Sequence, residues 1–163
     1  MGRKQKGFSL IELLIVVAVI LVIAAIAIPN LMRSRMAANE ASAVASLRSI
    51  NTSQIVYQNT YGPSFATKLV DLSDGGVAAN CLPSVTPTAT ASCLVDSALT
   101  TGTKSGYTFL YTPVSVGPTV TSYSVSADPI TSGSSGQRHF FTDDTNLIRV
   151  NPSAPATNTD PPL

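Results

Sequence analysis

A single carboxylate interrupts the longest apolar run of this chain. Glu12 is the only charged residue between Phe8 and Ile28. A carboxylate inside a membrane-spanning segment costs about 2.5–3.5 kcal/mol at mid-membrane and less near an end, so it is expected to have a partner. A cut between Gly7 and Phe8 would create an amino-terminal cation one helical turn from Glu12. No Lys, Arg or His occurs between Gly7 and Arg33, so such an amine would be the only partner for Glu12 at membrane depth.

The other reactive side chains are few and scattered. The chain has one histidine and no HExxH, GxSxG, Walker or GxGxxG pattern. Because no nucleophile or acid is tied to it, His139 is interpreted as a packed or surface residue, and the sequence predicts neither an enzyme nor a cofactor. Asp143, Asp144 and Asn146 could offer oxygen ligands to Ca²⁺. Turn formation is the preferred interpretation of these three residues, and calcium is the alternative.

The two cysteines, Cys81 and Cys93, are close in sequence. In a translocated domain such a pair forms a disulfide more often than a metal site, and His139 lies too far along the chain to join it. The bridge would close a loop of about a dozen residues and stabilise the fold by about 3 kcal/mol. It predicts an oxidising compartment.

Residues 8–30 form the element that must position Glu12. As a helix, Phe8 to Ile28 would span about 30 Å, the thickness of a hydrocarbon core. A cleaved secretory signal could use the small residues at 25–27, but the apolar core is long for such a signal and contains an acid. A simple signal anchor, with the basic leader held in the cytoplasm, leaves Glu12 and the Gly7–Phe8 junction unexplained.

The charge distribution excludes one broad class of function. Charged residues make up only 12% of the chain, which suits an extracytoplasmic protein. Three of the ten basic residues lie in the leader, so seven remain against nine acids and the body carries a net charge of −2. Arg33, Arg35 and Arg48 are interpreted as solvated or headgroup-level residues. Nucleic acid is therefore not expected as the main ligand.

The segment Gly7–Glu12, GFSLIE, resembles the class III signal of type IV pilins and type II secretion pseudopilins. The resemblance covers residues 1 to about 35. It implies that a prepilin peptidase cuts after Gly7 and that Phe8 becomes an N-methylated amino terminus. It also implies that Glu12 pairs with the Phe8 amine of an adjacent subunit during assembly. Pro29 matches the proline that kinks or melts this helix in assembled filaments.

The helix is expected to kink or open at Pro29 and to resume over residues 31–61, where it becomes amphipathic. Its apolar positions fall on one face at helical spacing. They are Met36, Ala43, Leu47, Ile50, Tyr57 and Tyr61. Residues 62–106 are expected to form a disulfide-containing loop region, with a short helix or turn near Leu69–Leu72.

Strand signals occupy residues 107–150, separated by short loops that favour an antiparallel meander. The expected strands are Tyr107–Thr112, Ser122–Ala127, Arg138–Thr142 and Leu147–Val150, and this region resembles the C-terminal sheet of major-pseudopilin-like proteins. Pro113 and Pro118 are expected to bound the first loop, and Asn146 to tolerate a left-handed turn. Residues 151–163, with four prolines, read as a flexible tail. The expected fold is α+β: a long N-terminal helix packed on about four antiparallel strands.

The leading hypothesis is a structural subunit of a type IV pilus-like filament. Residues 1–7 would be the leader, and residues 8–30 the transmembrane and later filament-core helix. The N-terminus would lie in the cytoplasm and the body in the periplasm before assembly into a periplasmic or extracellular filament. The resemblance implies self-assembly and four further partners: the prepilin peptidase, an inner-membrane platform protein, an assembly ATPase and a secretin. It also raises calcium binding near Asp143, which some major pseudopilins show.

Two alternatives remain open. The first is the major pseudopilin of a type II secretion system, favoured by cysteines that precede the strands instead of bracketing the C-terminal end. The second, from another class, is a membrane-anchored periplasmic binding module.

Overall fold

The computed structural model describes residues 7–163, so the basic leader, apart from Gly7, lies outside the described residues. The chain divides into two compact units with the boundary between Arg35 and Met36. One α-helix, α1 (Leu10–Tyr61), contributes to both units. Each unit is described separately below.

Helix α1 continues through Pro29, so the local opening that was one of the two outcomes expected there is absent from the described helix. A proline lacks the amide that would donate to the carbonyl four residues earlier, here that of Ala25. The remaining hydrogen bonds of this long helix hold the segment helical. Ser34, one turn beyond, donates from its hydroxyl to the carbonyl of Asn30 at 3.0 Å.

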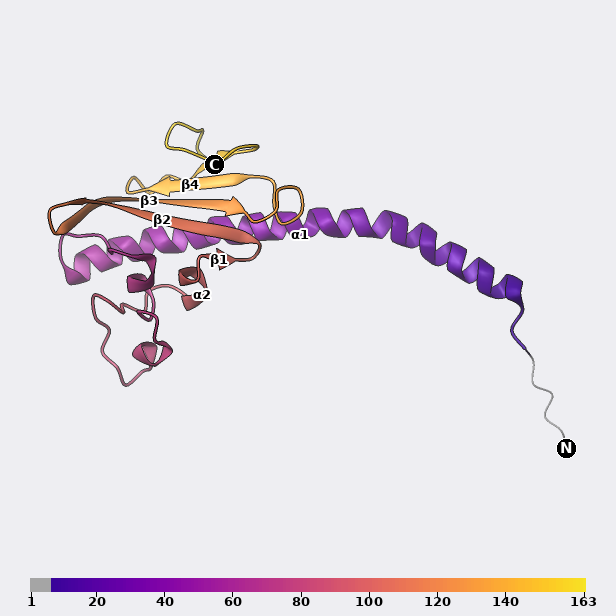
Figure 1. Cartoon of the computed structure of the whole chain (residues 1–163), viewed down its shortest axis with the longest axis horizontal. Helices are drawn as coiled ribbons and strands as arrows, with labels where there is room; N and C mark the ends of the chain where they lie inside the picture. Colours follow the sequence, from indigo (N-terminus) through magenta and orange to yellow (C-terminus); the bar gives the residue numbers. More distant parts are fainter. Residues whose placement is uncertain (1–6) are drawn as a thin grey trace. The chain divides into compact units, whose positions relative to one another are not determined.

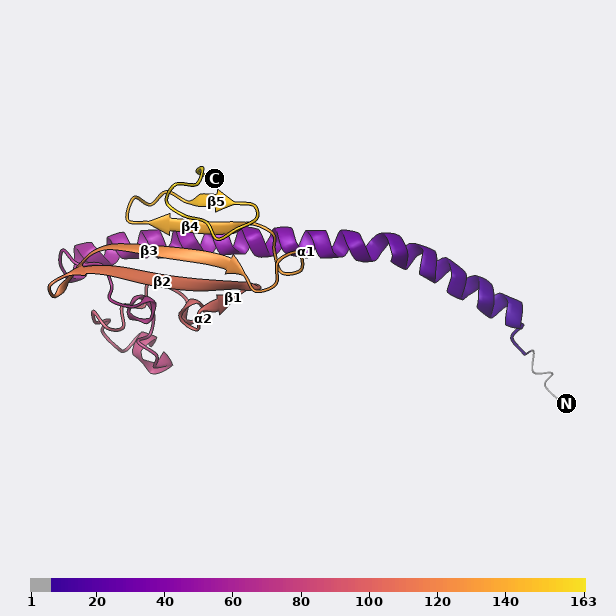
Figure 2. The same ribbon diagram turned by 45° about the horizontal axis from the view of Figure 1, so that its top comes forward.

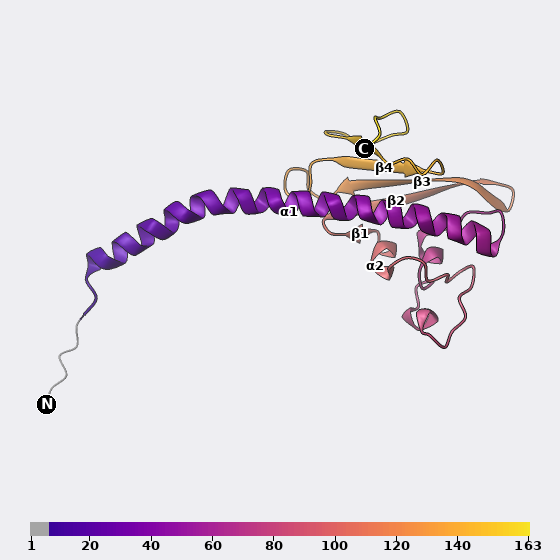
Figure 3. The ribbon, with the colours of Figure 1, turned by 180° about the vertical axis from the view of Figure 1, so that it is seen from behind.

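In the second unit, α1 lies along one face of an antiparallel sheet (Figures 1 and 3). The helical stripe predicted from the sequence supplies this contact. Ala43, Leu47, Ile50 and Tyr57 are buried in one core, and Tyr61 packs against it. Met36, at the start of the unit, is half-buried. The amphipathic pattern therefore identified the face that packs on the sheet.

The sheet has five strands in the order β1-β2-β3-β4-β5, with every neighbouring pair antiparallel (Figure 2). They are β1 (Thr103–Lys104), β2 (Tyr107–Val116), β3 (Thr119–Pro129), β4 (His139–Asp143) and β5 (Arg149–Asn151). The meander and the α+β class are confirmed, with β1 as an additional two-residue strand. Alternation on β3 puts Tyr123, Val125 and Ala127 into the core.

Strand β2 is longer than expected because Pro113 lies inside it instead of beginning the loop. The amide of Phe109 donates to the Gly102 carbonyl, on the side of β2 away from β3. Backbone groups alternate sides along a strand, so those of Pro113, four residues later, point to the same side as those of Phe109. Strand β1 pairs only with Tyr107 and Thr108. Pro113 therefore faces an open edge, where its missing amide donor breaks no ladder hydrogen bond.

Residues 62–106 contain short helices joined by turns. They are η1 (Leu69–Leu72), η2 (Ala78–Cys81) and α2 (Ser97–Thr100). The predicted short helix at Leu69–Leu72 is confirmed, and its two leucines are buried in the core. The Asp96 carboxylate accepts a hydrogen bond from the amide of Ala98, which begins α2. The predicted Cys81–Cys93 disulfide is present, with the two Cα atoms 5.6 Å apart.

Replacing both Cys81 and Cys93 by serine is expected to lower the free energy of unfolding by about 3 kcal/mol, because the unfolded chain regains the entropy of a loop of about a dozen residues. Thermal unfolding of the full chain in detergent measures the effect. Alkylation of the unreduced wild-type chain should detect no free thiol. Two reactive thiols in freshly purified protein would contradict the bridge.

Residues 151–163 fold back on β5, which corrects the expected flexible tail. The amide of Val150 donates to Pro161 and that of Leu163 donates to Ile148. The Asp160 carboxylate accepts hydrogen bonds from Asn151 (2.9 Å) and from the amide of Thr157 (2.7 Å). Prolines suit this arrangement because an irregular edge needs few amide donors. The tail has no apolar periodicity, so the sequence pattern gave no sign of these contacts.

Candidate functional site

Glu12 stabilises the start of α1 in the uncut chain. Its carboxylate accepts a hydrogen bond from the backbone amide of Ser9 at 2.9 Å, and the Glu12 amide donates to the Ser9 carbonyl at 3.1 Å. This is the glutamate half of a capping box, in which an acid at the third helical position satisfies the amide that precedes the helix. The S-x-x-E signature of this capping box is present at Ser9–Glu12 in the sequence, although it is not among the features predicted above.

The capping places the predicted cleavage junction outside the helix. Gly7, Phe8 and Ser9 have no helical structure, and α1 begins at Leu10. A peptide bond outside a helix is open to a peptidase in a way that a helical one is not. Gly7 and Phe8 thus lie before the helix start and Glu12 lies in its first turn, and their roles in processing and assembly stay predictions.

Every large aliphatic side chain from Leu10 to Met32 is exposed. This segment makes α1 the one described helix that is long and apolar enough to cross a membrane. Exposed apolar surface of this extent is unfavourable in water and marks a surface that lipid or protein covers. Within it, Glu12 is the only acid.

Glu40 fastens the second unit's helix to the loop before β4. Its carboxylate accepts hydrogen bonds from the amides of Gln137 (2.9 Å) and Arg138 (3.2 Å) and from the Arg138 guanidinium (2.8 Å). Burial alone would raise the pKa of Glu40, but these hydrogen bonds outweigh it and hold the pKa below its usual value. The neighbouring Asn39 side chain donates to the Ser135 carbonyl at 2.7 Å. Two adjacent helix residues thus hold one loop.

Replacing Glu40 by glutamine is expected to destabilise the domain by about 1 kcal/mol at pH 7, because charge-assisted hydrogen bonds are lost. Because the pKa of Glu40 is lower in the folded chain than in the unfolded chain, the unfolded chain protonates this carboxylate first as the pH falls. Glu40 therefore contributes stability above the ordinary carboxyl pKa and loses that contribution as the pH falls through its folded value. Thermal unfolding of wild type and Glu40→Gln at pH 7, 5 and 3.5 should show the difference between their unfolding midpoints shrinking as the pH falls. A difference that grows on acidification would contradict the lowered pKa of Glu40.

Two buried amides connect the helix to the sheet. Gln54 donates to the Tyr111 hydroxyl at 2.9 Å and accepts from the Ala66 amide at 3.0 Å. Asn51 donates to Thr142 at 2.8 Å and accepts from the Tyr123 hydroxyl at 3.1 Å. Burial raises the pKa of both tyrosines, so each keeps its proton and remains a donor. These polar residues were not predicted because they interrupt the apolar stripe.

The remaining sequence-predicted residues lie on the outer face and turns of the sheet. His139 is half-buried, and its Nδ1 lies 2.6 Å from an Asp128 carboxylate oxygen on the neighbouring strand, which agrees with a packed residue. Asp143 accepts hydrogen bonds from the amide and hydroxyl of Thr145, and Asn146 has a left-handed φ of 62°. Turn formation therefore accounts for this segment, and calcium binding stays a prediction.

Other recessed surfaces offer little chemistry. One is an open groove of about 450 Å³ along the edge of β2, lined by Lys68, Thr100, Tyr111 and Pro113 among others. Across residues 7–163, no three or more His, Cys, Asp or Glu side chains gather where they could hold a metal ion. The described residues are best explained as an anchored assembly unit: an apolar helix with one acid near its start, joined to a sheet domain.

Comparison with known proteins agrees with this class. Residues 2–28 match the family model described as the prokaryotic N-terminal methylation motif. The chain is 39% identical over 97 residues to the type IV wide pilus major component PilA4 of Thermus thermophilus, covering 57% of this chain and 73% of that protein. It is 43% identical over 51 residues to the type IV major pilin protein PilA of Myxococcus xanthus, covering 31% of this chain and 23% of that protein. No solved structure matches. The chain belongs to the type IV pilin family.

Proposed function

We propose that this chain is a major structural subunit of a type IV pilus. It is inserted in the inner membrane by residues 8–30, cut after Gly7 by a prepilin peptidase, and polymerised through its N-terminal helix. The observation that carries the proposal is the wholly exposed aliphatic surface of Leu10–Met32 with Glu12 as its only acid. Lipid covers such a surface before assembly, and the same segments of other subunits cover it afterwards.

The two pilus components to which the chain is similar support this function over that of a soluble or catalytic protein. The N-terminal methylation motif supports processing by a prepilin peptidase. An inner-membrane platform protein, an assembly ATPase and a secretin complete the proposed machinery, because a membrane-inserted subunit needs energy to leave the bilayer and a route through the outer membrane.

The proposed processing predicts that the mature chain begins at N-methylated Phe8. Intact-mass measurement of membrane or filament material should show a chain that lacks residues 1–7 and carries one extra methyl group. A chain that retains Met1 would contradict processing. A chain that begins at Ile28 would instead show cleavage as an ordinary secretory signal.

The alternative is the major pseudopilin of a type II secretion system, favoured by a disulfide that precedes the sheet and leaves the C-terminal end unbridged. Deletion of the gene separates the two functions. Loss of surface filaments with normal protein secretion indicates a pilin, whereas loss of secretion with filaments unchanged indicates a pseudopilin.

A further inference from the structure

An uncharged loop extends from the domain between Asp74 and Asp96, and no Asp, Glu, Lys, Arg or His lies between these two residues. Three aliphatic side chains on it are exposed: Val77 by 54%, Leu82 by 53% and Val85 by 41%. We call these three residues the loop patch. A loop that faced only water would gain nothing from such side chains.

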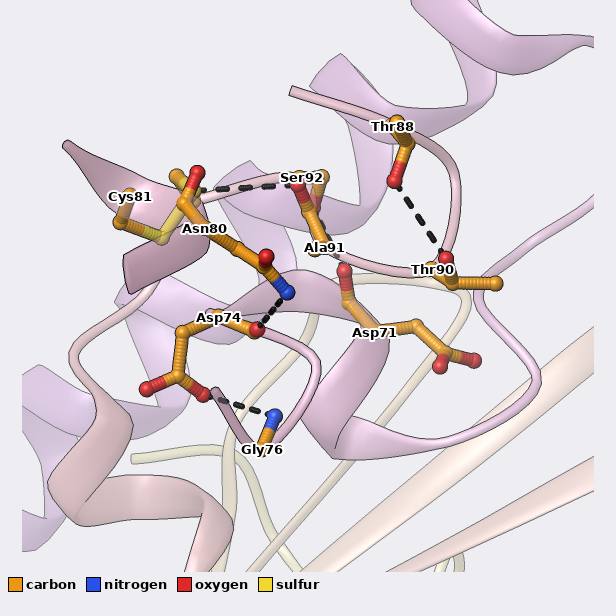
Figure 4. Close-up of a disulfide and its surroundings, with 10 residues drawn as sticks. Asp71, Asp74, Gly76, Asn80, Cys81, Thr88, Thr90, Ala91 and Ser92 are labelled. Atoms are coloured by element: carbon orange, nitrogen blue, oxygen red, sulfur yellow. Dashed lines mark hydrogen bonds between the residues drawn. A yellow bond between two sulfur atoms is a disulfide. The ribbon is translucent and has the colours of Figure 1, made fainter. Parts of the chain in front are cut away.

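Several contacts hold the loop in one conformation. The disulfide joins Cys81 to Cys93, and the Asn80 side chain points toward and donates to the Asp74 carbonyl at 2.8 Å (Figure 4). The Tyr57 hydroxyl of α1 donates to the Ala89 carbonyl at 2.8 Å. At Gly75, φ is +66° and a Cβ atom would lie 2.5 Å from the Thr90 carbonyl oxygen, so only glycine fits. A loop held in this way presents a preorganised surface, which reduces the entropy lost on binding.

A second uncharged surface lies on the hairpin of β2 and β3. Between Lys104 and Asp128 the chain again has no charged residue. Leu110, Val114 and Val116 of β2 are exposed by 64%, 52% and 69%. We call these three residues the hairpin patch.

Small polar residues leave the hairpin patch uncovered. The cross-strand partners of Leu110, Val114 and Val116 are Ser126, Ser122 and Thr119. The alternation of side chains along β2 and β3 puts these pairs on the face opposite the core. There the short side chains of β3 form a shallow strip beside the ridge of aliphatic side chains on β2. A large apolar side chain from another molecule would fit over this strip.

The geometry points to contact between these two patches in neighbouring subunits: we propose that the loop patch of one subunit packs on the hairpin patch of the next. The proposal rests on the proposed polymer. A growing filament is built from head-to-tail contacts, so each subunit needs two different surfaces that fit each other. A surface that meets only its own copy gives a closed two-fold pair and stops growth. Both patches are aliphatic and lie in segments without a charged residue, so neither attracts a charged partner.

Opposite charges placed in the two patches test the contact. Val114→Asp and Val85→Lys are each expected to reduce the yield of sheared filaments about tenfold, because an unpaired charge would be buried at the contact. The chain with both substitutions is expected to recover to within about threefold of wild type, because the two charges pair. The same-sign combination Val85→Asp with Val114→Asp should show no recovery. Filament yield is measured as the sheared fraction of total subunit and checked in electron micrographs.

Two controls separate the contact from folding and from nonspecific effects. Each variant should keep its Cys81–Cys93 bridge and the wild-type thermal unfolding midpoint. Leu147→Asp, which adds a charge outside both patches, should stay within about twofold of wild type. A tenfold loss with Leu147→Asp, normal yield from either single variant, or no recovery in the opposite-charge pair would overturn the proposal. Failure of the polymer itself would appear differently, as a wild-type chain that forms no filaments.

Discussion

Replacing Glu12 by alanine is expected to abolish filaments while the chain still accumulates in the membrane. An apolar residue at position 12 makes insertion more favourable, since the acid itself costs free energy in the bilayer. Filament assembly should fail because the Phe8 amine, which the proposed processing would create, would lose its only acidic partner at that depth of the helix. The yield of sheared filaments, compared with the membrane-bound pool, measures both effects in one experiment.

A second substitution separates ion pairing from helix capping. In the uncut chain the Glu12 carboxylate accepts the Ser9 amide at 2.9 Å. Glutamine at position 12 can still accept that hydrogen bond but has no charge. Glu12→Gln should therefore keep the helix start and still fail to assemble. Filaments from Glu12→Gln at wild-type yield would show that capping, not charge, is the contribution of Glu12.

Replacing Gln54 by leucine is expected to lower the free energy of unfolding by about 3 kcal/mol, although leucine is apolar and similar in size. The Ala66 amide would remain buried without its acceptor, and the Tyr111 hydroxyl would lose a donor. A buried polar group left without a partner costs about 1–3 kcal/mol, in addition to the lost hydrogen bonds. For a domain of this size, the unfolding midpoint should fall by roughly 10 °C.

Gln58 provides the matched control on the same helix. It is half-buried and makes one long hydrogen bond, 3.4 Å to the Pro63 carbonyl. Gln58→Leu should change the stability by less than about 0.5 kcal/mol, as is usual for surface substitutions. Thermal unfolding of both variants in detergent compares them directly. Equal midpoints for the two variants would mean that the Gln54 amide does not hold the helix on the sheet.

The elements that follow from the sequence are those with local signals. The helix has apolar residues at helical spacing, the strands alternate between short turns, and Asn146 adopts the left-handed conformation that a tight turn requires. The two cysteines are close enough in sequence to form their bridge with little constraint from the rest of the fold. Each of these predictions depends on neighbours within a few residues, so pattern and backbone sterics are sufficient.

The errors have a shared physical cause. Because proline interrupts strand ladders, the sequence predicts that Pro113 bounds a loop, yet it lies inside β2 with its backbone toward the side where no neighbouring strand uses it. The sequence predicts a flexible tail over residues 151–163, yet these residues bond to Ile148, Arg149 and Val150 at the sheet edge. In both cases the outcome depends on which strand lies alongside, and strand neighbours are determined by the whole sheet.

The sequence by itself determined the segment around Glu12. The glycine before the junction, the acid one turn after Phe8 and the following aliphatic run are consecutive in the chain, and their chemistry depends on spacing along one helix. Tertiary structure alone decided how the domain is held. It paired Glu40 with Arg138, buried Gln54 against Tyr111, and left aliphatic side chains exposed on the loop and hairpin. These contacts join residues far apart in sequence, and only the packing of the helix on the sheet brings them within reach of each other.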